Sequence, residues 1–441
     1  GFAPWMKVNL VLYESLGPAS FRFLTFLFFF CAGICLYGIS LKFGFLSLYQ
    51  RRVVTLLFLV LPFNTSRVAL IVFHYSEAYF LFFLGWLLLV TFNSLRVKFV
   101  CLLIFFLSFQ MHSMIFFYLL PIAHLFLNSK IRNIEDFFRW QIKNLVFLLL
   151  PFIYWILRFL YWPEKVQYHN VSIGAIGDSL VFLACAITTC LIIFWLLRKT
   201  DLNFRSSITM IYFGVLTLII ALYPYVLYGF FKSDSSLPLS YLSTLIGRTS
   251  WYTRHQTLQP LPVSLFIVGT INLFEVRFRR EFQTLYRSVL FACLVFNIGF
   301  GFEHVVDYSK QKQIIAQLKL SDRNQSKNLY QFIDQTTGIN ARGQTMYTPG
   351  WSGLIGIAYG SSEAGRIQIN TNCKSFENAR LVLIQGPGTH WEALKNWVSD
   401  GDMGFEVTVD DTPGACKPEM VTSEKVSGAI PILFYFTGAK G

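Results

Sequence analysis

The sequence predicts an α-helical polytopic membrane bundle followed by a small extracytoplasmic α+β domain. Hydrophobic residues make up 54% of the 441 residues and charged residues only 14%, whereas soluble domains carry about 25% charged residues. The net charge of +13 comes from residues 1–302, which hold 24 basic and 10 acidic residues, a balance of +14. Residues 303–441 are nearly neutral, with 13 basic and 14 acidic residues. We therefore place a membrane domain at 1–302 and a soluble domain at 303–441.

Apolar segments follow one another along the membrane domain. A full span needs about 20 apolar residues, and several of these segments are shorter. Counting the shortest pair as a hairpin, we expect about eight full spans. The segments are 22–40, 53–63 continuing to 75, 78–93, 99–109, 114–127, 144–161, 179–197, 207–231, 258–274 and 288–302.

The basic residues indicate which loops face the cytoplasm. Lys and Arg cluster in alternate loops, and such loops remain inside by the positive-inside rule. The loops at 64–77, 162–178 and 232–257 are poorer in basic residues and are expected outside. This alternation also places the C-terminal domain outside the cytoplasm. The excess charge is thus a topology signal, and we expect no nucleic-acid partner.

One pair of short segments interrupts the alternation. Segments 99–109 and 114–127 are joined by Gln110, Met111, His112 and Ser113, and basic loops flank the pair on both sides. We predict a hairpin that enters and leaves from the cytoplasm, with His112 at its apex. Irregular backbone at that depth is tolerated only in a protein interior or beside a wet cavity.

The C-terminal domain is predicted to start with a helix. Residues 310–335 have helical periodicity with a break near Ser321, and strand-like runs follow at 366–370, 381–385, 405–409 and 430–436. Cys373 and Cys416 are its only cysteines. In an oxidising compartment they would form one disulfide. The other six cysteines lie in apolar segments and are interpreted as core residues.

The stretch at 247–260 is the strongest candidate for a binding site. It places Arg248, Arg254 and His255 around Trp251 and Tyr252, where an outer loop re-enters an apolar segment. Guanidinium groups suit phosphate because their planar donors form bidentate hydrogen bonds. An anionic head group, such as the phosphate of a lipid-linked sugar, would explain the cluster. Arg side chains that extend to lipid head groups are the alternative.

A second polar set lies between two early apolar segments. Arg67, His74 and Glu77 are spaced by seven and ten residues, which places them near one face if the stretch is helical. Glu77 is the only acid between Glu14 and Glu135, and a carboxylate there could serve as a general base. A structural ion pair between Glu77 and Arg67 is the alternative. His112 could line the same cavity or could be a packing residue.

Several standard motifs are absent. No metal-ligand cluster, P-loop, dinucleotide fingerprint or nucleophile elbow occurs, so no metal site is assigned, and a divalent metal stays open as a cofactor. The loop Gly386-Pro-Gly-Thr-His-Trp391 could stack on sugar rings. A turn followed by core residues is the commoner explanation for such a loop.

The layout resembles the GT-C class of multi-spanning glycosyltransferases, which use polyprenyl-phosphate-linked sugars. The likeness rests on a first outer segment at 1–21, short broken helices around 53–75 and 99–127, an Arg-bearing outer loop and an extracytoplasmic C-terminal domain. In that class an acid in the first loop commonly serves as base. Glu14 is the only such acid here, so Glu14 and Glu77 are the two candidates. The sequence begins at Gly1 rather than Met, and an acid upstream is a further option.

The resemblance implies a bacterial-type inner-membrane enzyme that transfers a sugar from a lipid-linked donor to a glycan, lipid or protein acceptor. Arg67, Arg248 and Arg254 would hold the phosphate, and His255 would assist. A lipid-linked oligosaccharide polymerase or ligase has a similar outline. A transporter, or a membrane subunit of a larger assembly, is the non-enzymatic alternative. A transporter would be expected to carry ionisable residues near the bilayer midplane and an inverted repeat.

Overall fold

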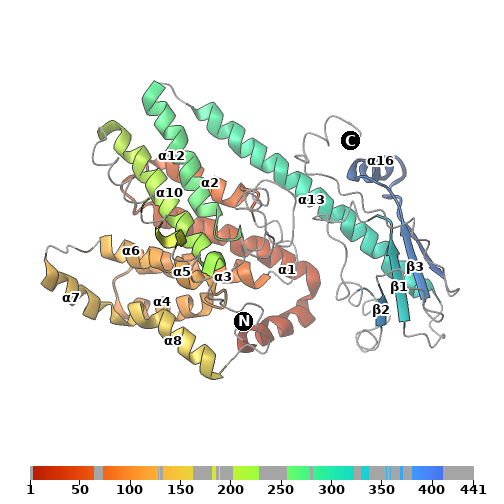
Figure 1. The fold of residues 1–441 in the computed structure, drawn as a ribbon, viewed down its shortest axis with the longest axis horizontal. Coiled ribbons are helices and arrows are strands. Elements are labelled where there is room, and N and C mark those ends of the chain that lie inside the picture. The colour runs from red at the N-terminus through yellow and green to blue at the C-terminus, as the bar shows by residue number, and fades with distance from the viewer. Residues whose placement is uncertain are drawn as a thin grey trace. The chain divides into compact units, whose positions relative to one another are not determined.

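The computed structural model describes a helical unit and a smaller unit that contains a sheet. The chain divides into unit 1, Gly1–Tyr241 and Tyr252–Val295, and unit 2, Leu242–Trp251 and Phe296–Gly441 (Figure 1). The described residues are 3–63, 73–127, 129, 133–161, 181–184, 188, 202–227, 256–278, 282–321, 329–336, 354, 358, 368–370 and 380–410.

Helices make up the described part of unit 1. The division between the units falls within the last helix, α13, whose first part belongs to unit 1. The helices are α1 (Ala3–Ser40), α2 (Leu48–Val60), α3 (Phe73–Thr91), α4 (Leu95–Ser108), α5 (Ser113–Phe117), α6 (Leu119–Leu127), α7 (Ile134–Lys143), α8 (Leu145–Tyr161), α10 (Leu202–Leu227), α12 (Pro260–Phe278) and α13 (Gln283–Leu320).

Unit 1 has the composition of a multi-pass membrane protein. Among the described helices, five are long and apolar enough to cross a membrane, and a sixth results if α7 and α8, bent by 52°, form one span. The five are Arg22–Ser40, Phe73–Thr91, Arg205–Pro224, Pro260–Phe278 and Gln283–Leu320. The described residues therefore do not reach the predicted eight. Helix α2 has only 13 residues, and most of the predicted segment 179–197 lies outside the described residues.

The first helix corrects one prediction. Residues 1–21 were expected to form the first outer loop, but α1 is helical from Ala3 onward and continues into the span. Its 38 residues correspond to about 57 Å at about 1.5 Å per residue, well beyond the roughly 30 Å hydrocarbon core of a bilayer. Glu14 lies on the part of α1 that precedes the span, and its side chain is outside the description.

The predicted break between two short helices is present. Helix α4 ends at Ser108 and α5 begins at Ser113. The backbone stays hydrogen-bonded through the break, because the Gln110 amide donates to the Leu107 carbonyl at 3.2 Å and the Met114 amide donates to the Met111 carbonyl at 2.8 Å. A break of this kind is compatible with burial at membrane depth. The path in and out on the cytoplasmic side stays a prediction.

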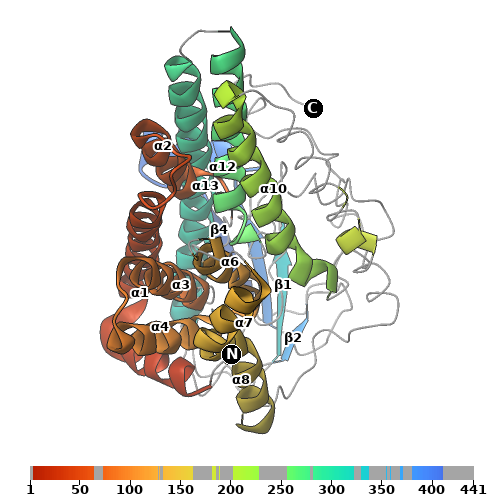
Figure 2. The same cartoon turned by 90° about the vertical axis from the view of Figure 1, so that its left-hand side faces the viewer.

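Aromatic side chains and one glycine contact hold unit 1 together. Phe29 of α1 stacks on Phe58 of α2 at 5.3 Å and on Tyr79 of α3 at 5.9 Å between ring centroids. Helices α10 and α12 lie side by side (Figure 2). Their backbones approach closely at Gly269, where an added Cβ would lie 3.0 Å from the Ile211 amide nitrogen. Small residues permit this approach between membrane helices.

Unit 2 contains a four-stranded sheet with the order β2-β1-β3-β4. Strand β1 pairs in parallel with β2 and β3, and β3 pairs antiparallel with β4. The core between α13 and the sheet is formed by Ile314, Leu318, Phe332, Val382 and Ile384. The remaining elements are β1 (Leu329–Asp334), β2 (Gln368–Asn370), β3 (Arg380–Gln385), α16 (His390–Asp400) and β4 (Glu406–Asp410).

Strand β1 corrects a second prediction. The helical periodicity assigned to 310–335 holds only to Leu320, where α13 ends, and Leu329–Asp334 is a strand. The reason is tertiary, because β1 has a partner on each side and its backbone groups are taken up by two neighbours. The expected strands at 366–370, 381–385 and 405–409 correspond to β2, β3 and β4, and 430–436 lies outside the described residues.

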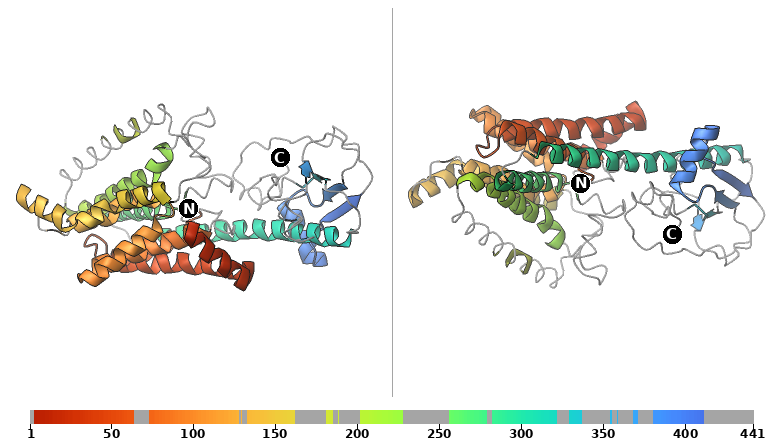
Figure 3. Two further views of the ribbon diagram at one scale, coloured as in Figure 1. Left: turned by 90° about the horizontal axis from the view of Figure 1, so that it is seen from below. Right: turned by 90° about the horizontal axis from the view of Figure 1, so that it is seen from above.

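Successive positions along α13 contact different elements of unit 2. Val306 packs against Ala393 of α16. One turn further, the fully buried Lys310 Nζ forms a salt bridge with Asp334 Oδ2 at 2.6 Å. Ile314 and Leu318 then pack on the strands. Helix α16 is thus closer than the sheet core to the apolar part of α13, and Figure 3 shows that it lies across α13 rather than along it.

Candidate functional site

A buried carboxylate lies where α3 meets the break between α4 and α5. Glu77 is in the first turns of α3 and is only 5% exposed. Gln110, in the break, donates from Nε2 to Glu77 Oε2 at 3.4 Å. This contact joins residues 33 positions apart. It therefore brings the predicted hairpin apex to the predicted acid.

The His112 side chain is held in the same break. The neighbouring Phe109 ring packs edge-on against Tyr154 of α8 at 5.6 Å, and the His112 ring lies 6.4 Å from the same tyrosine. Among the described residues, the buried His112 Nε2 atom has no hydrogen-bond partner. A buried imidazole nitrogen without a partner is costly. A water molecule or a ligand would satisfy it.

A positive charge reaches the same region from α8. Arg158 follows Tyr154 by one turn and lies within electrostatic range of the His112 imidazole. We call Glu77, Gln110, His112, Tyr154 and Arg158 the Glu77 cluster. It combines a carboxylate, an imidazole and a guanidinium, which can accept a proton, donate a hydrogen bond and bind an anion.

The other predicted site residues are described only in part. His74 lies in the first turn of α3, with its ring 5.8 Å from that of Phe73. Directly after His255, the chain continues with three buried polar residues, Gln256, Thr257 and Gln259. The predicted residues outside the described part are Arg67, Arg248, Trp251, Tyr252, Arg254, His255, Cys373 and Cys416. Among the described cysteines, Cys31, Cys35 and Cys101 are free thiols.

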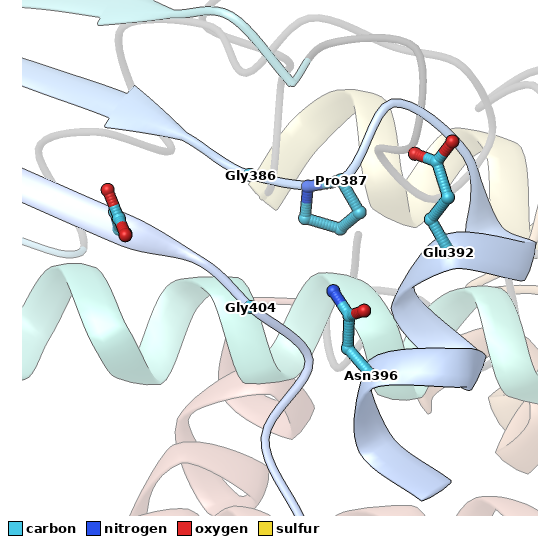
Figure 4. Close-up of a pocket in the computed structure, with 6 residues that line it drawn as sticks. Gly386, Pro387, Glu392, Asn396 and Gly404 are labelled. Carbon is cyan, nitrogen blue, oxygen red and sulfur yellow. The ribbon is translucent and has the colours of Figure 1, made fainter. Parts of the chain in front are cut away.

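Unit 2 contains an open groove at the carboxyl end of β3. The groove has a volume of about 430 Å³ and is lined by Gly386, Pro387, Glu392, Asn396, Gly404 and Glu406 (Figure 4). It lies in the loop singled out from sequence, whose Thr389 caps α16 by accepting from the Glu392 amide at 3.2 Å. Glu392 Oε2 accepts from the Gly388 amide at 2.8 Å and so closes the loop onto the helix. His390 is buried, and Trp391 is exposed.

The groove has a defined chemical preference. Among the described residues that line it, the charged side chains are the carboxylates Glu392 and Glu406, and none is a Lys, Arg or His. A carboxylate is an acceptor only, so the lining favours hydroxyl groups or cations and disfavours phosphate. Ligands of open α/β sheets bind beyond the carboxyl ends of the strands, which is the position of this groove.

Sequence reasoning missed some residues of both sites. Gln110 was noted only as part of a connection, although an amide beside a predicted apex histidine is a usable signal. Glu392, Asn396 and Glu406 carried no signal of their own, because they are separated along the chain and meet through the β3–α16–β4 turn.

Within the described ranges, no group of three or more His, Cys, Asp and Glu side chains is arranged to hold a metal ion. No protein-family model, curated protein or solved structure matches the chain.

Proposed function

We propose that the protein is a membrane glycosyltransferase that takes a sugar from a polyprenyl-phosphate-linked donor on the extracytoplasmic side. The observation that carries the proposal is the contact between the buried Glu77 carboxylate and Gln110 in the α4–α5 break, beside His112. Buried ionisable groups in membrane proteins are costly and are retained for function or for a partner.

In this mechanism Glu77 is the general base. The acceptor hydroxyl gives its proton to the Glu77 carboxylate, and the acceptor oxygen attacks the anomeric carbon of the sugar. The bond between that carbon and the phosphate oxygen breaks, and polyprenyl phosphate leaves as an anion. Gln110 orients the carboxylate through its hydrogen bond, and His112 donates a hydrogen bond to the leaving phosphate.

The donor phosphate would be held by guanidinium groups. Arg158 already belongs to the Glu77 cluster, and Arg67, Arg248 and Arg254 complete the set in the proposal. Arg254 and His255 directly precede Gln256, which is buried in unit 1. This closeness in sequence is the reason for including Arg254 in the proposed phosphate site. The extracytoplasmic location of the C-terminal domain and a count of about eight spans are also part of this proposal.

The groove of unit 2 supports a hydroxyl-rich acceptor. Its carboxylate lining disfavours the phosphate of the donor, so donor and acceptor would be recognised by different chemistry. A glycan acceptor fits this division, because sugar hydroxyls donate to carboxylates.

The variant Glu77→Gln tests the role of the carboxylate. The glutamine keeps an oxygen that accepts from Gln110 but does not act as a base, so folding is retained while turnover falls by about 100- to 10,000-fold. The assay uses purified protein in nanodiscs with C55 polyprenyl phosphate linked to glucose, galactose or mannose. Released C55 phosphate is measured by mass spectrometry, with water or added oligosaccharide as acceptor.

Three results are decisive. Turnover by the wild type with loss in Glu77→Gln supports the proposal. Equal turnover in both proteins removes Glu77 from the mechanism. No turnover of any donor by the wild type, with the protein folded and unable to bind C55 phosphate in native mass spectrometry, contradicts the proposed function.

Phosphate recognition has a matched arginine control. Arg254→Gln and Arg248→Gln are expected to weaken binding of C55 phosphate about tenfold or more, the loss of one charge-assisted hydrogen bond of roughly 1.5–3 kcal/mol. Arg139→Gln is the control, because Arg139 is exposed and pairs with Glu135 on α7. If all three variants bind C55 phosphate equally well, Arg248 and Arg254 are not part of the donor site.

A further inference from the structure

Helix α16 lies beside α13 near the end of the apolar part of α13. Ala393 packs with Val306, Met403 and Phe405, and Phe302 packs against this group. All of these residues belong to unit 2. The contact therefore fixes the level of α16 along α13 independently of unit 1.

That level coincides with a membrane boundary. Residues 288–302 of α13 carry no charged side chain and are flanked by Arg287 and Glu303. A span needs about 20 residues, so a span centred on this run ends within about one turn of Val306. The sheet core contacts Ile314 and Leu318, about 12–18 Å further along at about 1.5 Å per residue. With the span placed on this run, α16 is the element of the described part of unit 2 that would lie at the bilayer surface.

On its exposed side, away from Ala393, α16 carries large apolar side chains together with Lys395, which follows Trp391 by four residues. Trp391 is 59% exposed and Val398 is 75% exposed. With the partly buried Leu394 they follow the spacing of three and four residues that marks one helical face. Trp397, also exposed, flanks this face. Tryptophan is enriched at membrane–water interfaces because its ring is apolar and its N–H is polar.

We propose that α16 is an interfacial helix whose face of Trp391, Leu394, Trp397 and Val398 inserts among the lipid head groups. An interfacial helix lies in the membrane plane, and α16 crosses α13 as that requires (Figure 3). Its charged residues are Glu392, Lys395 and Asp400, so it carries no basic excess. The attraction is therefore hydrophobic and does not need anionic lipid.

Insertion of α16 among the head groups would hold its part of unit 2 at a fixed height above the bilayer. Glu392 and Asn396 are on the polar side of α16 and line the groove. Anchoring α16 holds this groove at the level of the head groups, where a lipid-linked molecule presents its polar part. The anchoring stands whether or not the protein transfers sugar, because it rests on α16 and α13 alone.

Photo-crosslinking tests the anchoring directly. The photoreactive residue p-benzoylphenylalanine is placed at position 391 or 398 of the full chain in phosphatidylcholine nanodiscs. Ser399 is the control position, because it is exposed but lies on the polar side of α16. Phospholipid adducts are counted by mass spectrometry after illumination. We expect at least fivefold more adducts at positions 391 and 398 than at 399, unchanged in high salt.

Other occupants give different products. Adducts to peptides of the same chain, or to a second copy of it, in place of lipid would overturn the inference. Equal lipid labelling at positions 391, 398 and 399 would also overturn it. A requirement for phosphatidylglycerol would overturn the hydrophobic mechanism. Because p-benzoylphenylalanine replaces exposed side chains, none of these outcomes depends on a repacked core.

Discussion

The buried ion pair between α13 and β1 gives a sharp test of how unit 2 is held together. Lys310 is fully buried, and its Nζ lies 2.6 Å from Asp334 Oδ2. The other carboxylate oxygen accepts from the Thr336 amide at 2.9 Å and from the Thr336 hydroxyl at 2.8 Å. Asp334 thus joins the end of β1 to the helix, and Lys310→Met removes its cationic partner while keeping the length of the side chain.

The expected loss follows from the remaining contacts. Removing one partner of a buried ion pair costs about 3–5 kcal/mol, because the other charge is left uncompensated. The two hydrogen bonds from Thr336 still satisfy one oxygen of Asp334, so we expect the lower end, about 3 kcal/mol. Since about 1.4 kcal/mol corresponds to a factor of ten, amide exchange in β1 and β3 should accelerate by roughly 150-fold.

Hydrogen–deuterium exchange of the protein in nanodiscs measures this change. Peptides that cover β1 and β3 report on unit 2, and peptides of α3 serve as an internal reference. Lys312→Met is the matched control, because Lys312 is exposed on the same helix, and surface substitutions usually change stability by less than about 0.5 kcal/mol. If Lys310→Met exchanges no faster than Lys312→Met, the ion pair does not hold β1 to α13, and the reasoning fails.

Two further predictions compare glycines with matched controls. Gly269→Ala places a Cβ against the α10 backbone at 3.0 Å and is expected to destabilise unit 1 by about 1–3 kcal/mol. Gly299→Ala, with nothing within 4 Å of the added Cβ, should be neutral or slightly stabilising. Thermal unfolding in detergent compares the two variants, and equal melting temperatures would contradict the close packing. Gly404→Ala adds a contact at 2.5 Å with the Asn396 side chain to a φ of 77°, so it should loosen α16 more than Gly401→Ala, whose φ is 74° in open space. Hydrogen exchange of the α16 peptide measures that difference, and greater loosening by Gly401→Ala would refute it.

The candidate site was partly predictable. Glu77 stood out from the sequence because it is an isolated acid in a long apolar stretch, and the break at Gln110 stood out because the flanking segments are short. Both signals come from the cost of polar groups in hydrocarbon. Their contact was not predictable, because a hydrogen bond between residues 33 positions apart depends on how α3, α4 and α5 pack.

The residues that line the groove of unit 2 were also only partly predictable from the sequence. The Gly-Pro-Gly loop predicts a turn, whereas helix α16 was not predicted from the sequence. The turn signal does not place Glu406 of β4 and Glu392 of α16 on the lining of one groove. That arrangement depends on the antiparallel pairing of β3 with β4.

The amino-acid sequence by itself determined that this is a multi-pass helical membrane protein, where its long apolar segments lie and where the α4 helix breaks. Those properties follow from local hydrophobicity, because each helix must satisfy its own backbone in a lipid environment. Tertiary structure decided that Leu329–Asp334 is a strand and that Glu77 meets Gln110. Pairing partners on both sides and packing between distant helices outweigh local preference, and neither is written in a short stretch of residues.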